Sequence, residues 1–67
     1  MTPIRMSRIA TGMTQGEFAK KLGVSQVTVC RWEMGYGFPK VSRLKEVADL
    51  LGVSVLDLLG DKERRIG

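Results

Sequence analysis

Apolar residues recur along this chain at the three- and four-residue spacing of short helices, and single glycines separate one apolar group from the next. Phe18, Ala19 and Leu22 form one such stripe, while Lys20 and Lys21 fall outside it. Runs of β-branched residues are brief and lie beside expected helix caps. The pattern therefore predicts an all-α domain built from short helices.

Start and stop residues bound each expected helix. Thr14-x-x-Glu17 has the spacing of a capping box, in which each side chain accepts a hydrogen bond from the other residue's backbone N–H. Ser54-x-x-Asp57 repeats this spacing, and Thr2 precedes Pro3 as the cap of the first helix. Glycine follows each segment as its stop. The expected helices span about residues 3–11, 15–22, 26–34, 41–51 and 55–59, with stops at Gly12, Gly23, Gly35, Gly52 and Gly60.

The apolar side of each segment supplies the expected core. Ile4 and Ile9 are expected to face inward from the first helix, and Val24 to fill the angle between the second and third. A rotation of about 100° per residue puts Val29 and Trp32 on the inner side of the third helix. The last two helices contribute Leu44, Val47, Ala48, Leu51, Val55, Leu58 and Leu59.

The charge balance bears on the kind of partner. The chain has 11 Lys and Arg against 7 Asp and Glu, a net charge of +4, and its pI is ≈ 9.7. Such a surplus fits a phosphate backbone, although many small proteins are mildly basic. With 67 residues, of which 43% are hydrophobic, the chain makes one globular domain.

The residues available for chemistry argue against an enzyme. Histidine is absent and Cys30 is the single cysteine, so no intramolecular disulfide and no cysteine-only metal site can form. Neither an evident pair of catalytic acids nor a glycine-rich phosphate loop is found. We therefore expect no enzymatic activity, no cofactor and no metal. No apolar run is long enough for a membrane and Arg5 and Arg8 interrupt any leader, so we expect a cytoplasmic protein.

A series of short motifs runs along the chain in order and without a gap. They are Thr14-Gln15, Phe18-Ala19, Leu22-Gly23-Val24-Ser25, Val29, Arg31-Trp32-Glu33, Gly35, Pro39, Leu51-Gly52-Val53-Ser54 and Leu58-Leu59. In these residues the chain resembles the phage-repressor type of helix-turn-helix domain, the Cro/CI or XRE-like family. The resemblance implies a lambda-repressor-like bundle of five short helices in a domain of residues 1–60. It places the motif at residues 15–34 and the recognition helix at about residues 26–34, followed by a charged, flexible tail at residues 61–67.

Base contacts are expected on the outer side of the third helix. Its helical geometry turns Val27, Cys30, Arg31 and Met34 away from the core, and Gln26 lies at its start. The start of such a helix reaches base edges. Gln26 can bond adenine, Arg31 can bond guanine, and Val27 can contact a thymine methyl group. We therefore expect Gln26, Val27 and Arg31 to contact bases, with an ordinary exposed helix start as the alternative for Gln26 and Val27.

A phosphate contact is expected at the start of the second helix. Gln15 is its first residue, where a free backbone N–H and the helix dipole favour an anion. The resemblance implies that Gln15 holds the DNA backbone and also the side chain of Gln26. Thr28 has two alternatives, a bond to a phosphate or a bond within its own helix.

One position departs from the family pattern. Met34 occupies a place where the family often has an asparagine that binds a phosphate, and a thioether is too weak an acceptor to replace it. The nearest further candidates for phosphate contacts are Tyr36, Lys40 and Arg43. For Tyr36 the alternative is packing of its ring against the surrounding loop.

Four other residues attract attention. The resemblance implies a structural ion pair between Arg8 and Glu33. Cys30 lies on the outer face, where an oxidised thiol would obstruct a groove, but no second cysteine is near it in the sequence. Leu56 is an extra apolar residue where the family commonly has a polar one. It is a candidate dimer contact, or else it packs against the tail near Ile66.

The resemblance implies a sequence-specific double-stranded DNA-binding transcriptional regulator, a repressor, acting as a homodimer in a bacterial or phage setting and associated with the nucleoid when bound. The alternative is an antitoxin or phage accessory module that uses the fold mainly to bind a protein partner such as a toxin. An apolar corner at Met34, Tyr36 and Phe38 would suit that role. A steep dependence of affinity on salt concentration would distinguish DNA binding from binding of a protein partner.

Overall fold

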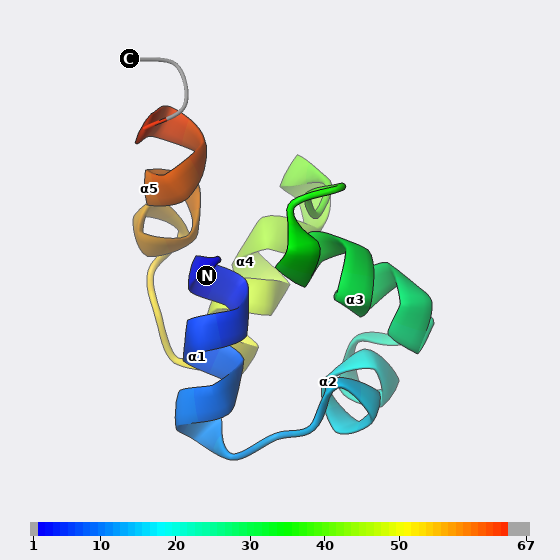
Figure 1. Ribbon diagram of the computed structural model, residues 1–67. Coiled ribbons are helices and arrows are strands. Elements are labelled where there is room, and N and C mark those ends of the chain that lie inside the picture. The colour runs from blue at the N-terminus through cyan, green and yellow to red at the C-terminus, as the bar shows by residue number, and fades with distance from the viewer. Residues whose placement is uncertain (1, 65–67) are drawn as a thin grey trace.

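The computed structural model describes residues 2–64, with side chains through residue 59. All of the regular structure in this part of the chain is helical, which confirms the expected all-α bundle (Figure 1). The five elements are α1 (Pro3–Thr11), α2 (Gln15–Leu22), α3 (Gln26–Met34), α4 (Val41–Leu51) and α5 (Val55–Arg64). α2 packs mainly on α3, while α1 touches α3, α4 and α5. The α2–α3 pair therefore forms one side of the molecule, with the other helices behind it.

Side-chain caps explain where the helices begin. The capping box at α2 is complete, with Glu17 N donating to Thr14 Oγ1 at 3.1 Å and Thr14 N donating to Glu17 Oε1 at 2.9 Å. The box at α5 is complete too, because Ser54 and Asp57 exchange two such bonds of 3.1 Å. The ends follow from backbone geometry, since α1 to α4 stop at glycines with positive φ. These are Gly12, Gly23, Gly35 and Gly52.

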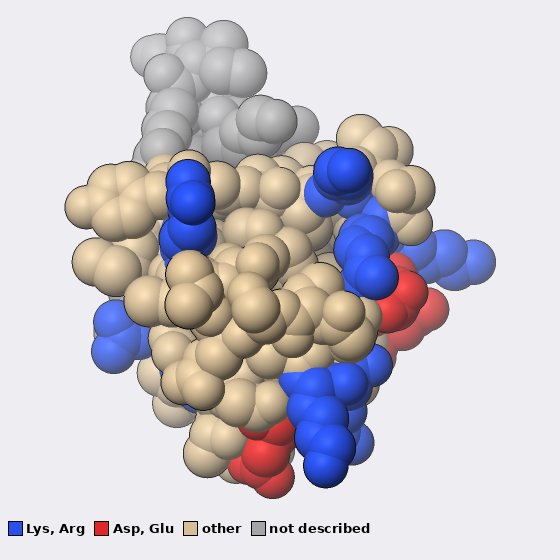
Figure 2. Space-filling model, turned by 90° about the vertical axis from the view of Figure 1, so that its right-hand side faces the viewer, with Lys and Arg blue, Asp and Glu red and all other residues tan. Residues whose placement is uncertain are grey.

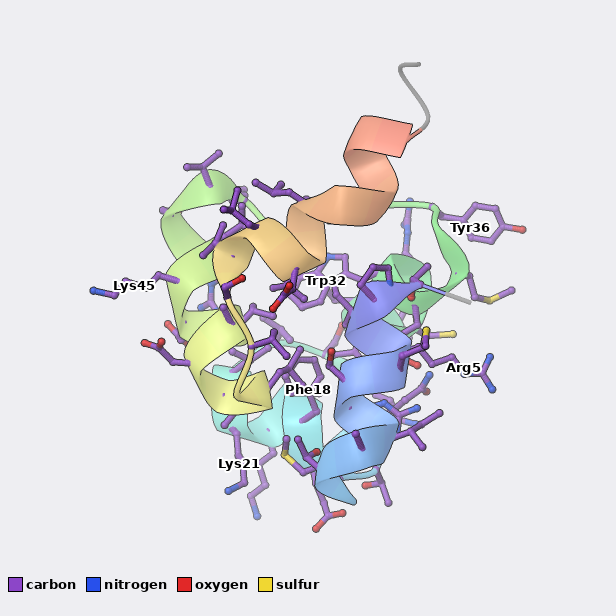
Figure 3. The ribbon with its side chains drawn as sticks, turned by 90° about the vertical axis from the view of Figure 1, so that its left-hand side faces the viewer. Arg5, Phe18, Lys21, Trp32, Tyr36 and Lys45 are labelled. Carbon is purple, nitrogen blue, oxygen red and sulfur yellow. The ribbon has the colours of Figure 1, made fainter. Side chains whose placement is uncertain are left out.

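The core lies at the centre of the bundle, where all five helices contribute buried side chains, and it contains Phe18 and Trp32, which both point to the centre of the molecule (Figure 3). Val24 packs against its edge as expected. The other buried apolar side chains are Ile4, Ala19, Leu22, Val29, Leu44, Val47, Ala48, Leu51 and Leu58.

The prediction for Ile9 was wrong. Its side chain is 50% exposed, whereas that of Ile4 is 2% exposed. Five residues at about 100° each turn Ile9 well away from the direction of Ile4. Arg8, four residues after Ile4, takes the inner position and reaches Glu33 on α3.

The predicted end of α5 at Gly60 was also wrong, because the helix continues to Arg64. A glycine inside a helix costs only about 1 kcal/mol relative to alanine, so it does not stop a helix by itself. Residues 61–64 of the expected tail are therefore helical. Residues 65–67, with the suggested packing of Leu56 on Ile66, lie outside the described residues.

Arg43 ties the α2–α3 pair to the rest of the bundle. Its Nη1 donates to the carbonyl oxygen of Leu22 at 2.6 Å, so α4 caps the last turn of α2. A second tie joins α1 to α3, since Thr2 Oγ1 donates to the carbonyl oxygen of Glu33 at 3.1 Å. These two bonds satisfy helix-end carbonyls and fix the orientation of the pair.

Candidate nucleic-acid interface

The outer face of α3 carries exposed side chains near both of its ends. Val27 is 68% exposed and Met34 60% exposed, whereas Val29 and Trp32 on the inner side are 0% and 8% exposed. Arg31 is also exposed and lies one helical turn after Val27. Figure 2 looks onto the α2–α3 side, where uncharged residues fill the centre and Lys and Arg lie along the flanks.

Gln26 lies across the first turn of α2. Its Oε1 is 3.6 Å from the point where a Cβ atom on Gly16 would be, so the two helix starts meet at this place. Gln26 remains exposed there. The structure thus brings Gln26 close to the start of α2, and it presents Val27 and Arg31 on the same face of α3.

Gln15 begins α2 and is half-buried. Its Nε2 donates to Glu33 Oε1 at 3.1 Å. The resemblance implied a contact between Gln15 and Gln26, but the side-chain hydrogen bond that the structure gives to Gln15 goes to Glu33. The first turn of α2 also holds the backbone N–H groups of Gln15 and Gly16, while that of Glu17 donates to Thr14 Oγ1 in the capping box.

Arg8 and Glu33 form a two-pronged ion pair. Arg8 Nε bonds Glu33 Oε2, and Arg8 Nη2 bonds Glu33 Oε1 at 3.1 Å. The two side chains are 12% and 2% exposed. Burial acts to raise the pKa of Glu33, but hydrogen bonds from Arg8 and Gln15 and the charges of Arg8 and Arg5 outweigh it, so the pKa of Glu33 is lowered.

Two further phosphate candidates, like Gln15, already have partners in the fold. Thr28 Oγ1 lies 2.9 Å from Ser25 Oγ, and the Thr28 backbone N–H donates to the same oxygen at 3.1 Å. Arg43 donates to Leu22 and lies 3.8 Å from Glu46. A phosphate contact by either residue would use its remaining hydrogen-bonding capacity or displace these bonds.

Tyr36 and Lys40 are freer to reach a ligand. Tyr36 is 71% exposed, and Figure 3 shows its ring projecting from the loop after α3, on the same edge as Arg5. This exposure does not favour the alternative of packing against the loop. Lys40 is exposed and occupies the cap position of α4, where it makes no side-chain capping bond.

Other exposed residues extend this description. Leu56 on α5 is 73% exposed, and Val41 at the start of α4, which the sequence interpretation did not single out, is 85% exposed. Arg5 was also missed as a surface cation near Glu33, although its place one turn before Arg8 could have suggested it. Cys30 Sγ lies 3.9 Å from Met34 Sδ.

Residues 2–64 contain no helix whose length and apolar character would let it cross a membrane. Within the same part of the chain, no three side chains of the Cys, Asp and Glu types gather into a metal-ligand set.

Comparisons with known proteins agree with this geometry. A family model described as "Helix-turn-helix" matches residues 4–58. The chain is 31% identical over 61 residues to the HTH-type transcriptional activator BcrR of Enterococcus faecalis, covering 88% of this chain and 30% of that protein. It is 34% identical over 53 residues to the cryptic phage CTXphi transcriptional repressor RstR of Vibrio cholerae serotype O1, covering 79% and 47%.

A second RstR, also from Vibrio cholerae, is 32% identical over 63 residues, covering 94% of this chain and 57% of that protein. The chain therefore spans less than two thirds of the length of each of these three relatives. No solved structure matches the chain significantly.

Proposed function

The chain belongs to the helix-turn-helix family, and on this basis we propose that it is a sequence-specific double-stranded DNA-binding transcriptional regulator. The observation that carries the proposal is the two-sided α3. Its inner side is buried in the core, while Gln26, Val27 and Arg31 are exposed along its outer side. A helix held in this way by a second helix fits the major groove.

Each outer residue of α3 has a base that suits its chemistry. The carboxamide of Gln26 can bond adenine N6 and N7, and the guanidinium of Arg31 can bond guanine O6 and N7. The methyl groups of Val27 suit a thymine methyl. Each bidentate pair contributes about 1–3 kcal/mol of discrimination against a wrong base.

The DNA backbone is contacted by residues near both ends of α3. The start of α2, with Gln15, offers N–H groups and a positive dipole end to one phosphate. Tyr36 and Lys40 serve phosphates beyond the other end of α3, where Met34 contributes none. Arg43 and Thr28 assist after their contacts within the fold are satisfied.

The regulator acts as a homodimer on a two-fold related site. The half-sites lie about 34–36 Å apart, so that two copies of α3 enter successive major grooves on one face of the DNA. The exposed Leu56 supports a contact between copies, because an apolar side chain that is 73% exposed gains from burial.

We propose that the regulator represses transcription. We also propose that it is located in the cytoplasm and is associated with the nucleoid when it is bound to DNA. Two of the related proteins are named transcriptional repressors and one a transcriptional activator. Blocking a promoter requires occupancy of the site alone, which suits a chain whose matched region is the DNA-binding module.

A second candidate function is binding of a protein partner such as a toxin. Met34 and Tyr36, which lie on either side of Gly35 and are 60% and 71% exposed, favour it. Phosphate neutralisation makes the logarithm of the affinity fall steeply with the logarithm of the salt concentration. A partner held by apolar contacts shows a shallow dependence, so a salt titration separates the two.

Selection of random duplex DNA by the purified chain tests the proposal. Enrichment of a palindrome is expected. Equal binding of selected and scrambled duplexes would contradict sequence-specific binding. Enrichment of a single half-site would contradict binding as a homodimer.

A further inference from the structure

The carboxylate of Glu33 is a meeting point of three helices. Glu33 lies on α3 and is 5% exposed, a buried charge among the described side chains. Arg8 reaches it from α1 and Gln15 from α2. The ion pair with Arg8 accounts for the burial of this charge, but it does not account for the bond to Gln15.

That bond fixes which way the Gln15 carboxamide faces. An ionised carboxylate only accepts hydrogen bonds, so Glu33 selects the NH₂ group of Gln15 and excludes its oxygen. One of the two N–H groups of Nε2 is then directed at Glu33 Oε1. Because the carboxamide is planar, the directions of the second N–H and of Oε1 are fixed as well.

The fixed carboxamide lies where a backbone contact is proposed. Gln15 is the first residue of α2, and it is only half-buried, so part of its polar surface faces solvent. Its remaining N–H is a donor that suits a phosphate oxygen. A side chain that is already ordered loses less rotamer freedom when a ligand binds.

We propose that Glu33 is a positioning residue of the DNA interface, which orients the side chain of Gln15 toward a phosphate while it pairs with Arg8. This inference rests on the proposed function. It assigns Glu33 a second role that the ion pair alone does not require.

The sign of the expected effect separates this role from simple electrostatics. Removal of a negative charge from a DNA-binding protein strengthens its binding to DNA through the long-range field. Loss of an oriented donor weakens binding. Glu33→Met removes both the charge and the acceptor, so weaker binding to DNA indicates that orientation outweighs charge.

A double-mutant cycle measures whether Glu33 acts through Gln15. The native chain, Glu33→Met, Gln15→Ala and the double variant are titrated against one 20-base-pair duplex of arbitrary sequence at low salt, after circular dichroism has shown that each is folded. Asp49→Asn is the matched control, because Asp49 is a solvent-exposed acid on α4 and its replacement removes one negative charge away from the proposed interface.

Glu33→Met is expected to weaken binding about three- to tenfold in the native background and less than about twofold when Gln15 is alanine. Asp49→Asn is expected to leave binding unchanged or slightly stronger. Equal weakening by Glu33→Met in both backgrounds would show a purely structural role and overturn the inference. If Gln15→Ala alone binds DNA with the affinity of the native chain, Gln15 does not contact a phosphate, and the inference is overturned.

A measurement on the native sequence decides the matter if Glu33→Met does not fold. In the nuclear magnetic resonance spectrum, the Gln15 Nε2 proton that faces Glu33 is expected downfield of its ordinary position, with a cross-peak to the side-chain protons of Glu33. Two proton signals at ordinary positions, without that cross-peak, would overturn the inference. The choice of operator sequence is tested separately by the selection experiment, so failure of one does not imply failure of the other.

Discussion

Lys40→Ser is expected to stabilise the domain and to lower its affinity for DNA. Lys40 is the cap residue of α4, with φ −61° and ψ 150°, and its side chain makes no capping bond. Threonine or serine oxygens accept such bonds at the starts of α1, α2, α3 and α5. The backbone of Lys40 is already extended in the way that a capping serine requires.

The magnitude follows from two contributions. A side-chain cap in place of a non-capping residue contributes about 1 kcal/mol. Removal of a cation from the positive end of the helix dipole adds about 0.3 kcal/mol at an exposed site such as this one. For a domain of this size, about 1.3 kcal/mol corresponds to a rise in melting temperature of roughly 5–10 °C.

Thermal unfolding followed by circular dichroism measures the first effect, with Lys45→Ser as the matched control. Lys45 is an exposed lysine inside α4, so its replacement removes the same charge without creating a cap. The control is expected to lose about 0.5 kcal/mol through the lower helix propensity of serine. An unchanged or lower melting temperature for Lys40→Ser would refute the capping argument.

The same variant tests the phosphate role of Lys40. Loss of one phosphate contact reduces the slope of log affinity against log salt by about 0.9. A native slope in Lys40→Ser, together with native affinity, would remove Lys40 from the interface. A gain in stability together with a loss of affinity would show that lysine at this position favours DNA binding and lowers the stability of the fold.

Three further predictions concern other parts of the molecule. Gly16→Ala is expected to stabilise the domain by about 0.5 kcal/mol in urea unfolding, because its new Cβ meets Gln26 Oε1 at an ordinary 3.6 Å; a destabilised variant would contradict this. Leu56→Lys is expected to shift the chain toward monomer, and an unchanged sedimentation profile would remove Leu56 from the dimer contact. The lowered pKa of Glu33 contributes stability that is present above its unfolded pKa of about 4.3 and is lost as the pH falls through the lower folded value. Glu33→Gln is therefore expected to lose less stability than the native chain on acidification below about pH 5, and parallel curves would refute the assignment.

The local signals in the sequence predicted most of the fold. Thr14-x-x-Glu17 and Ser54-x-x-Asp57 marked helix starts because capping depends on residues only three apart. The exception was the stop expected at Gly60, because a glycine ends a helix only where the backbone adopts a left-handed turn. Whether it does so is decided by packing and by the residues that follow.

The misplacement of Ile9 had a different cause. Its apolar character suggested burial, but its rotation from Ile4 excluded the inner face, which Arg8 occupies instead. The contacts of Gln15 and Arg43 could not be predicted for a related reason. Each bonds a residue about twenty positions away, Glu33 and Leu22 respectively, and no periodic pattern reports such long-range pairings. Exposure of the outer face of α3, in contrast, followed from the burial of Val29 and Trp32 on its opposite side.

The central claim is that the outer face of α3 reads bases. The most direct test is to measure the affinity of the native chain and of Arg31→Ala for the selected duplex and for a set of its single-base-pair variants. Arg31→Ala is expected to lose about 1–3 kcal/mol of discrimination at one guanine position and to keep the preferences of the native chain elsewhere. An even loss of affinity across all the duplexes, with every base preference retained, would contradict the claim.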